Sequence, residues 1–342
     1  MKVLVTGHKG YIGTILTPML IERGHKVVGL DSDLYRQCTF GDDLTAVREI
    51  RKDIRDVELA DMKGLDSVIH LAGLSNDPLG DLNSELTYEI NHKASVRLAQ
   101  LAKKAKINRF IFSSSCSTYG AAGEDMISEE APFNPVTPYG RSKVMTERDL
   151  SKLADADFSP VFLRSATAYG VSPRLRFDLV LNNLVAWAYT TGKIHLKSDG
   201  TPWRPIVHIE DISRAFIAAL EAPRDVIHNE AFNVGSNHQN YQIIEIARIL
   251  QKMMPAYDIE YAKNAGPDNR CYRVDFTKIA ANLPDFKVKW DAEMGARQLH
   301  ESFERVGVSL EDFEGPQYKR VDHIKQLIEK GPLGRDLRWK ES

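Results

Sequence analysis

Cysteines and long hydrophobic runs are scarce in this chain of 342 residues. Its three cysteines, Cys38, Cys116 and Cys271, are too few and too scattered for a disulfide framework or a zinc site. No apolar run approaches the roughly 18 residues that a membrane-spanning helix needs. The first residues also lack the pattern of a signal peptide. We therefore expect a soluble, cytoplasmic protein that binds no metal.

An excess of positive charge is absent as well. Lys and Arg together number 45 against 47 for Asp and Glu, a formal net charge of -2. This balance provides no general basic field for nucleic acid or for an acidic membrane surface, so we expect neither partner. Hydrophobic residues make up 43% and charged residues 27% of the chain. These values are ordinary for globular proteins and exclude collagen-like, fibrous and disordered chains.

Short β-branched runs alternate with longer helical patterns through the first half of the chain. Strands are predicted at 2–6, 26–30, 67–71, 109–113, 160–164 and 231–235. Helices are predicted at 12–23, 84–105 and 241–254. This alternation predicts an α/β fold in which helices cover both faces of a parallel sheet.

A glycine-rich turn joins the first predicted strand to the first helix. Gly7, Gly10 and Gly13 let the chain turn tightly and approach a pyrophosphate, while the helix N-terminus provides free N–H groups. Asp31 closes the next strand, where a carboxylate can accept ribose hydroxyls and repel a 2′-phosphate. The turn therefore predicts a dinucleotide site that prefers NAD, with Arg36 as the reason to keep NADP open.

The glycine turn defines a Rossmann-type, doubly wound parallel sheet with a smaller, interleaved C-terminal lobe. We assign the NAD-binding domain to 1–165, with 205–235 returning to it, because these segments hold the predicted strands. The substrate-binding lobe would consist of 166–204 and 236–342. The charged tail from Leu333 to Ser342 is expected to fray.

The GxxGxxG spacing resembles that of the extended short-chain dehydrogenase/reductase superfamily, and within it the NAD-dependent nucleotide-sugar epimerase/dehydratase family. Further stretches that match in order, over about residues 1–240, are 52–55, 70–73, Asn91, 112–120 and 139–143. The similarity is greatest to UDP-sugar 4-epimerases. It implies NAD contacts from Gly7, Gly10, Tyr11, Ile12, Gly13, Asp31, Asp53, Ile54, Leu71, Ala72, Gly73, Asn91, Ser113, Tyr139 and Lys143.

The same resemblance implies a catalytic Ser115, Tyr139 and Lys143. Tyr139 and Lys143 are four residues apart and so share one helix face, with Pro138 in the first turn and Thr137 as the cap. A free tyrosine has a pKa near 10, and a neighbouring ammonium group favours its phenolate. Tyr139 would move the hydroxyl proton of the substrate, while Lys143 would also hold the cofactor ribose.

The residues after Ser115 narrow the reaction. In related sugar dehydratases two acids stand there, and in related decarboxylases a Glu stands second, whereas this chain has Cys116 and Ser117. Cys116 should point to the opposite face of its strand as a small buried residue. We therefore predict C4 epimerisation of a nucleoside diphosphate hexose through a transient 4-keto intermediate. A nucleotide-sugar 4-ketoreductase or dehydrogenase, and a catalytically idle NAD(H)-sensing regulator, remain as alternatives.

The resemblance also assigns the substrate side. It implies that arginines hold the substrate diphosphate and that hydroxyl groups contact the sugar. The residues concerned are Ser117, Thr167, Arg176, Arg204 and Arg270. A homodimer is expected as well, which pairs the helix at 84–105 and the helix that begins near Tyr139.

Overall fold

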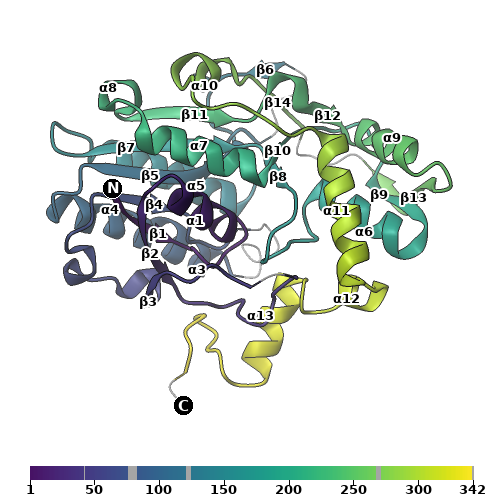
Figure 1. Cartoon of the computed structure of the whole chain (residues 1–342), viewed down its shortest axis with the longest axis horizontal. Coiled ribbons are helices and arrows are strands. Elements are labelled where there is room, and N and C mark those ends of the chain that lie inside the picture. The colour runs from purple at the N-terminus through teal and green to yellow at the C-terminus, as the bar shows by residue number, and fades with distance from the viewer. Residues whose placement is uncertain (42, 76–82, 121–124, 267–270, 341–342) are drawn as a thin grey trace.

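A seven-stranded parallel sheet forms the centre of the computed structural model, which describes residues 1–41, 43–75, 83–120, 125–266 and 271–340 (Figure 1). The strand order is β11-β7-β5-β4-β1-β2-β3. Their bounds are β1 (Lys2–Thr6), β2 (Lys26–Asp31), β3 (Arg48–Arg51), β4 (Ser67–His70), β5 (Arg109–Ser115), β7 (Ser159–Ser165) and β11 (Glu230–Val234). The order reverses at β1, so the predicted doubly wound sheet is confirmed.

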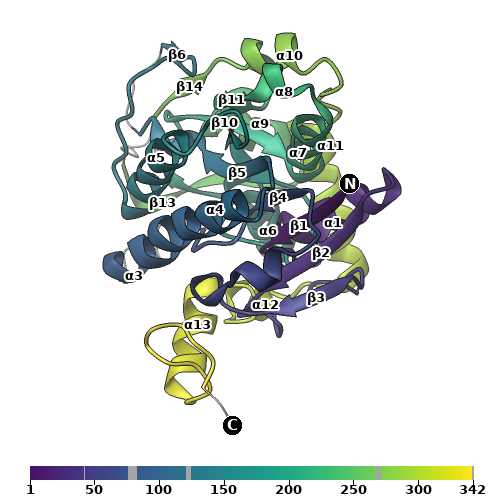
Figure 2. The same ribbon diagram turned by 90° about the vertical axis from the view of Figure 1, so that its left-hand side faces the viewer.

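Helices cover both faces of this sheet, as Figure 2 shows. Along β1, Val3 and Val5 belong to one hydrophobic core, whereas Leu4 between them belongs to another. Side chains alternate in this way because successive residues of a strand point to opposite faces. The first core lies under α1 (Gly13–Glu22) and α7 (Ile209–Glu221). The second lies under α3 (Ser84–Tyr88), α4 (Ser95–Lys104) and α5 (Pro138–Ser151).

The helix predicted at 84–105 is present but is interrupted. A π-helical segment, η3 (Glu89–Ala94), separates α3 from α4. The carbonyl of Asn91 accepts hydrogen bonds from Ser95 Oγ at 2.8 Å and Thr146 Oγ1 at 3.0 Å. Side-chain donors thus compete for a carbonyl of the helix at this point, a local arrangement that the hydrophobic period did not reveal.

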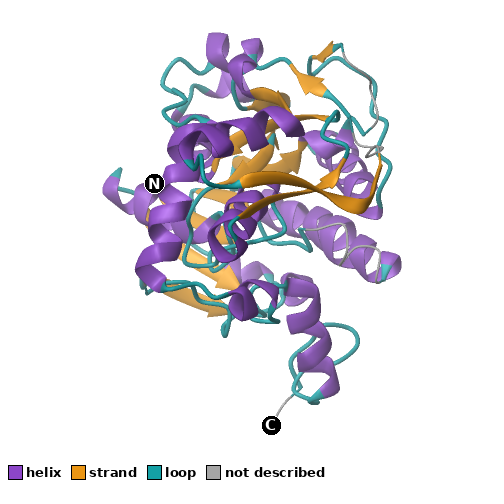
Figure 3. Ribbon diagram, turned by 90° about the vertical axis from the view of Figure 1, so that its right-hand side faces the viewer, coloured by secondary structure: helices purple, strands orange, loops and turns teal. Residues whose placement is uncertain are grey.

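A smaller lobe is built around a third hydrophobic core. Its helices are α6 (Val180–Thr191), α9 (Ile243–Met253), α11 (Ala292–Val306) and α12 (Leu310–Glu314). One small sheet joins β8 (Thr167–Tyr169), β10 (Trp203–His208) and β12 (Asn240–Gln242), and a second pairs β9 (Lys193–Ser198) with β13 (Asp258–Gly266) (Figure 3). The remaining elements are β6 (Met126–Ile127), β14 (Arg273–Val274), α8 (Arg224–Ile227), α10 (Thr277–Asn282), η1 (Ile54–Asp56), η2 (Leu59–Met62), η4 (Cys116–Thr118) and η5 (Asn237–Gln239).

The last part of the chain leaves this lobe and returns to the sheet domain. Helix α13 (Arg320–Glu329) and the residues after it lie below β2 and β3 (Figure 1). Ile324, Leu327, Leu333 and Leu337 belong to the second core, together with Leu4 of β1. The tail was expected to fray, but it is folded as far as Lys340, because apolar side chains spaced between its charges reach that core. Among the described residues, we find no helix with the length and apolar character to cross a bilayer.

Candidate active site

A cavity of about 840 Å³ opens at the carboxyl ends of the strands, between the sheet and the smaller lobe. Ligands of open α/β sheets bind at this edge, where the strand order reverses. The volume lies toward the upper end of the range for ligand pockets. The walls carry residues from the loops that follow β1 and β4, from β2, β5 and β8, and from α5, α6 and α13.

The glycine turn forms one end of the cavity. Gly7 has φ +74, and a Cβ atom added to it would lie 2.7 Å from the nitrogen of Ala72. A Cβ on Gly13 would lie 2.3 Å from the carbonyl oxygen of Gly7. Helix α1 starts from Ile12, which makes no side-chain cap hydrogen bond, and its first turn holds no acidic residue. This described stretch therefore offers a bare, positively polarised helix end that suits a pyrophosphate.

Asp31 lies beside the glycine turn, as predicted. Its carboxylate accepts hydrogen bonds from the backbone N–H of Lys9 at 3.0 Å and of Asp33 at 2.8 Å. Desolvation by the surrounding protein raises the pKa of Asp31, and these two N–H groups oppose that effect. Arg36 is the residue that left NADP as an alternative cofactor. Its guanidinium stacks 4.4 Å from the centre of the Trp339 ring. The basic group is therefore engaged elsewhere.

Most of the predicted adenine and ribose contacts lie on the cavity wall, and Asn91 is the exception. Asp53, Ile54, Leu71, Ala72 and Gly73 all line the cavity. The Asp53 carboxylate caps η1 by accepting from the backbone N–H of Arg55. It also forms an ion pair with the guanidinium of Arg55 at 2.7 Å.

Asn91 differs from its predicted role as a cofactor contact, because it is buried behind the cavity wall rather than on it. Its side-chain amide accepts from the backbone N–H of Leu74 at 2.7 Å and donates to the carbonyl of Leu74 at 2.9 Å. These two bonds use the Asn91 amide to fix the loop after β4. Asn91 thus positions a cavity wall from the π-helical segment.

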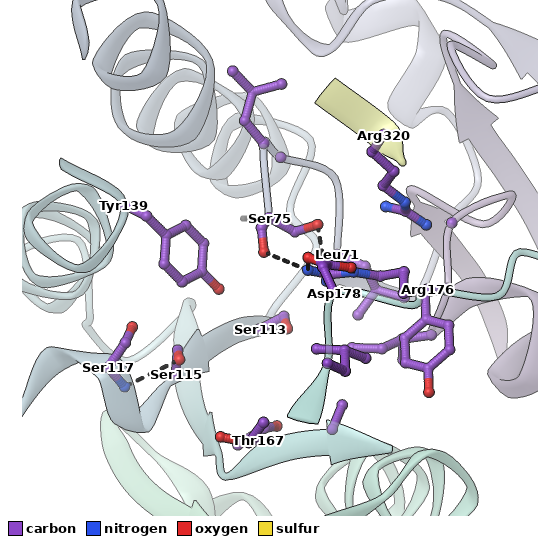
Figure 4. A pocket seen from close by; sticks show the side chains of 18 of the residues that line it. Leu71, Ser75, Ser113, Ser115, Ser117, Tyr139, Thr167, Arg176, Asp178 and Arg320 are labelled. Atoms are coloured by element: carbon purple, nitrogen blue, oxygen red, sulfur yellow. Dashed lines mark hydrogen bonds and ion pairs between the residues drawn. The ribbon is translucent and has the colours of Figure 1, made fainter. Parts of the chain in front are cut away.

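The predicted reacting centre comes together where β5 ends and α5 begins. The hydroxyl of Thr137 accepts from the backbone N–H of Gly140 at 3.1 Å and caps α5, whose first residue is Pro138. Tyr139 and Lys143 share one face of this helix, with the Lys143 nitrogen 5.5 Å from the Tyr139 ring centre. Figure 4 shows the Tyr139 phenol pointing into the cavity near Ser115.

Lys143 is a buried cation in the cavity wall. Its Nζ donates to the backbone carbonyl of Ser113 at 2.6 Å and lies 4.6 Å from the ring centre of Phe112. Burial lowers the pKa of Lys143 to about 8, and the Glu147 carboxylate opposes that shift. The lysine is therefore still mostly protonated at neutral pH, but it loses its proton at a lower pH than an exposed lysine does.

A buried ion pair supports this centre from behind. Glu147, one turn after Lys143 on α5, accepts from Arg164 Nη2 at 2.7 Å and from the hydroxyl of Ser114. Arg164 also donates to the Tyr119 hydroxyl at 2.9 Å. Because Ser114 belongs to β5 and Arg164 to β7, the pair holds α5 against two strands. No motif in the sequence pointed to this arrangement.

Hydroxyl groups gather at the other end of the cavity, toward the smaller lobe. Ser117, Ser165 and Thr167 all line it. The Ser117 and Ser165 hydroxyl oxygens are buried and lack hydrogen-bond partners among the described residues. Cys116, in contrast, is 1% exposed and donates to the carbonyl of Arg164 at 3.1 Å, as a buried residue should. The cavity therefore presents hydroxyl donors at this end and no thiol from Cys116.

Basic side chains face the middle of the cavity. Arg176 pairs with Asp178 at 2.7 Å and donates to the Ser75 carbonyl at 3.3 Å (Figure 4). Arg204 lines the cavity from β10 and donates to the carbonyl of Trp203 at 2.9 Å. The predicted Arg270 lies outside the described residues.

The sequence analysis missed Arg320 and Leu337, which line the cavity from the C-terminal segment.

These observations define the class of the protein. A glycine turn that leaves no room for a Cβ, an acid beside it and a Tyr–Lys pair across the cavity fit NAD and the extended short-chain dehydrogenase/reductase type. The chain belongs to the NAD dependent epimerase/dehydratase family, which matches residues 3–235. The cofactor is therefore NAD, and the protein is an enzyme.

Characterised relatives agree with this placement. The UDP-glucose 4-epimerase of Neisseria meningitidis serogroup C is 28% identical over 336 residues, covering 88% of this chain and 95% of that protein. The UDP-glucose 4-epimerase of Neisseria gonorrhoeae is 30% identical over 287 residues, covering 73% and 82%.

Solved structures are similar over nearly their whole length. MoeE5 in complex with UDP-glucuronic acid and NAD has a TM-score of 0.77 at 27% identity, covering 89% of this chain and 99% of that one. UDP-glucuronic acid 4-epimerase from Bacillus cereus has a TM-score of 0.74 at 25% identity, with the same coverage. The comparisons therefore support a nucleotide-sugar epimerase or dehydratase.

Proposed function

We propose that this enzyme is an NAD-dependent 4-epimerase of a UDP-sugar. The observation that carries the proposal is the placement of Tyr139 and Lys143 on one face of α5, opposite Ser115, in a cavity continuous with the glycine turn. The names of the curated relatives support the uridine nucleotide and the C4 position.

The residues of the chain divide the chemistry among themselves. The Ser115 hydroxyl holds the C4 oxygen of the sugar, and Tyr139 takes the proton from that oxygen and later returns it. Lys143, held at Ser113, keeps positive charge beside the phenol and favours its deprotonated form. NAD, held by the glycine turn, Asp31 and Lys143, would supply reversible hydride transfer at C4. Inversion at C4 would then require this cavity to let the sugar present its other face.

The neighbourhood of Ser115 argues against dehydration. A dehydratase of this family type needs acid–base groups beside the serine, whereas Ser117 has a hydroxyl there and Cys116 is buried away from the cavity. Burial also raises the pKa of the Cys116 thiol, which makes it a poor base. The groups beside Ser115 therefore favour oxidation and reduction at a single carbinol carbon of the sugar over loss of water.

A UDP-hexuronic acid is the second candidate substrate. The specific observation in its favour is the pair of buried hydroxyls of Ser117 and Ser165, both without partners among the described residues. Together with Thr167 they offer several O–H donors at the sugar end of the cavity, and a sugar carboxylate accepts such bonds strongly. Of the two solved structures reported above, MoeE5 is in complex with UDP-glucuronic acid, and the Bacillus cereus protein is a UDP-glucuronic acid 4-epimerase.

The deciding experiment incubates the purified holoenzyme with UDP-glucose, UDP-N-acetylglucosamine and UDP-glucuronic acid separately, and follows the products by mass spectrometry and NMR. We expect inversion at C4 without a change of mass and without added NAD. A product lighter by two hydrogens would assign a dehydrogenase instead, and loss of water would assign a dehydratase. Tight NAD binding with no conversion of any sugar would favour a sensing regulator.

A further inference from the structure

The chain ends in a small hairpin that nothing in the family resemblance assigns. Leu333 and Trp339 form an antiparallel bridge, and the backbone N–H of Gly334 donates to the carbonyl of Arg338 at 2.8 Å. The N–H of Lys340 donates to the carbonyl of Pro332 at 3.0 Å. We call residues 332–340 the C-terminal hairpin. It follows α13 directly and lies against the sheet domain (Figure 2).

One side of the hairpin is attached to the loop that follows Asp31, the last residue of β2. Trp339 Nε1 donates to the carbonyl of Ser32 at 2.6 Å. On the same ring stacks the guanidinium of Arg36, 4.4 Å from its centre. A charge-assisted stack and a short hydrogen bond therefore fix the tryptophan to the loop that carries the ribose-binding acid.

The other side of the hairpin is attached to the turn after β3, which begins at Asp53. Arg55 donates to the carbonyl of Asp336 at 2.9 Å, and the same guanidinium pairs with Asp53 at 2.7 Å. Arg338 forms an ion pair with Asp56. The hairpin thus joins the two segments that border the predicted ribose and adenine contacts.

Between these attachments, the hairpin reaches the cavity itself. Leu337 is 5% exposed, lines the cavity and packs in the same core as Ile54. Helix α13 adds Arg320, whose guanidinium lies 4.4 Å from the Tyr35 ring centre and also lines the cavity. An apolar wall with a neighbouring cation is suited to the adenosine half of a dinucleotide, whose base is flat and apolar on its faces.

We propose that the C-terminal hairpin closes the adenosine end of the cofactor cavity and sets how slowly NAD leaves the enzyme. The catalytic residues lie at the other end, since Tyr139 and Ser115 belong to the β5 and α5 side. The hairpin therefore acts on retention of the cofactor and makes no direct contact with the reacting centre. Slow release suits an enzyme that regenerates its cofactor in every turnover.

The test measures exchange of bound NAD for labelled NAD in the holoenzyme, together with affinities for ADP-ribose and UDP. Leu337→Ala removes apolar contact from the cavity wall, so ADP-ribose should bind about tenfold more weakly and NAD should exchange correspondingly faster. Trp339→Ala should accelerate exchange by a similar factor. Trp339→Phe keeps a ring for Arg36 and should restore part of the slow exchange. Arg335→Ala, exposed on the same hairpin, is the matched control and should exchange like the wild type.

Affinity for UDP separates a local effect from general damage to the fold. The proposal expects UDP to bind the Leu337→Ala and Trp339→Ala proteins as it binds the wild type. Wild-type rates of NAD exchange in both variants would overturn it. So would equal losses of UDP and ADP-ribose affinity, because they would indicate a fold disturbed as a whole. If UDP does not bind the wild type either, the UDP-sugar proposal fails, and thermal unfolding of the ligand-free variants takes its place as the fold control.

Discussion

The side-chain nitrogen of Lys143 lies 2.6 Å from the backbone carbonyl oxygen of Ser113. This bond fixes α5 to the end of β5 and so places the helix that carries Tyr139 beside the strand that carries Ser115. It also holds a buried cation at the one point of the cavity wall where a phenolate would need it. The relationship connects two groups that can be changed separately, the phenol of Tyr139 and the cation of Lys143.

The proton carrier is tested by Tyr139→Phe. This substitution keeps the ring but removes the hydroxyl, so turnover should fall at least about a hundredfold, as expected for loss of a general acid–base group. Bound NAD should remain, because the glycine turn and Asp31 are unchanged. Tyr261→Phe, at an exposed position on β13, is the control. Near-normal turnover of the Tyr139→Phe protein on its true substrate would contradict the mechanism.

The cation is tested by Lys143→Met. This variant should bind NAD more weakly and turn over more slowly, because it removes both the predicted ribose contact and the charge beside Tyr139. Equilibrium dialysis measures the affinity for NAD, and steady-state kinetics measures the turnover. Weak NAD binding is the outcome that distinguishes this variant from Tyr139→Phe.

The buried charge also makes a prediction about stability. The pKa of Lys143 is about 8 in the folded protein, below the ordinary lysine value of 10.5. Between these two pH values the unfolded chain holds a proton that the folded chain has lost, so the free energy of unfolding contributed by this residue rises with pH. The wild type should gain up to about 3 kcal/mol over Lys143→Met from pH 8 to 10.5. If the free energies of unfolding of the wild type and Lys143→Met, measured in urea, change in parallel from pH 8 to 10.5, the lowered pKa of Lys143 is contradicted.

Local patterns explain which parts of the fold could be predicted. The glycine turn, the buried strands and the cap of α5 each depend on residues close together in the chain, so the sheet and the Tyr139–Lys143 face followed from the sequence. Strand β3 did not, because it lies at the sheet edge and its four residues, Arg48–Arg51, include only one apolar side chain. An edge strand that faces water lacks the hydrophobic run that marks a buried one.

Distant contacts explain what could not be predicted. The pairing of Glu147 with Arg164 depends on how α5 packs against β7, which no spacing in the sequence reveals. The charged tail carried Leu337 and Trp339 at irregular intervals, without helical or strand period. Only long-range contacts place Trp339 against Ser32 and bring Leu337 beside Ile54 to the wall of the cavity.

Cofactor choice is tested at Asp31. Asp31→Ala should weaken NAD binding, because it removes the carboxylate that is predicted to accept the ribose hydroxyls. The double variant Asp31→Ser with Ser32→Arg should admit NADP, since it exchanges a repelling charge for an attracting one. The new arginine is needed because Arg36 is engaged with Trp339. Titration calorimetry with both cofactors measures the change, and a wild type that already prefers NADP would contradict this assignment.

The predicted contact of Arg204 with the substrate diphosphate is tested by Arg204→Ala. Loss of a charge-assisted bond in a desolvated site costs roughly 1.5–3 kcal/mol, so the KM for the nucleotide sugar should rise about ten- to a hundredfold. NAD affinity should be nearly unchanged, because Arg204 enters from β10 and not from the glycine turn. Arg273→Ala provides the matched control, because its guanidinium lies 4.5 Å from the ring centre of Trp203 on β10 but Arg273 is absent from the cavity lining. An unaltered KM would place Arg204 outside the substrate site.

Acid sensitivity should come from His70 at the end of β4. This side chain is 1% exposed and lies between Thr6 Oγ1 at 2.6 Å and Ser95 Oγ at 2.7 Å. Burial, with a smaller effect from the Lys143 charge, lowers its pKa to about 3. The unfolded chain binds a proton below about pH 6.5, but the folded chain does not, so stability falls as the pH drops from 6.5 toward 3.

At pH 5 this effect should amount to about 2 kcal/mol. His70→Gln cannot take up the proton, so its free energy of unfolding should be lower at neutral pH but should fall less on acidification. The free energies of unfolding of the wild type and His70→Gln, measured in urea, should therefore converge as the pH falls from 6.5 to 5. His238→Gln, at an exposed position, should have the same pH dependence as the wild type. If the difference between wild type and His70→Gln stays constant over this range, His70 is not the source of the acid sensitivity.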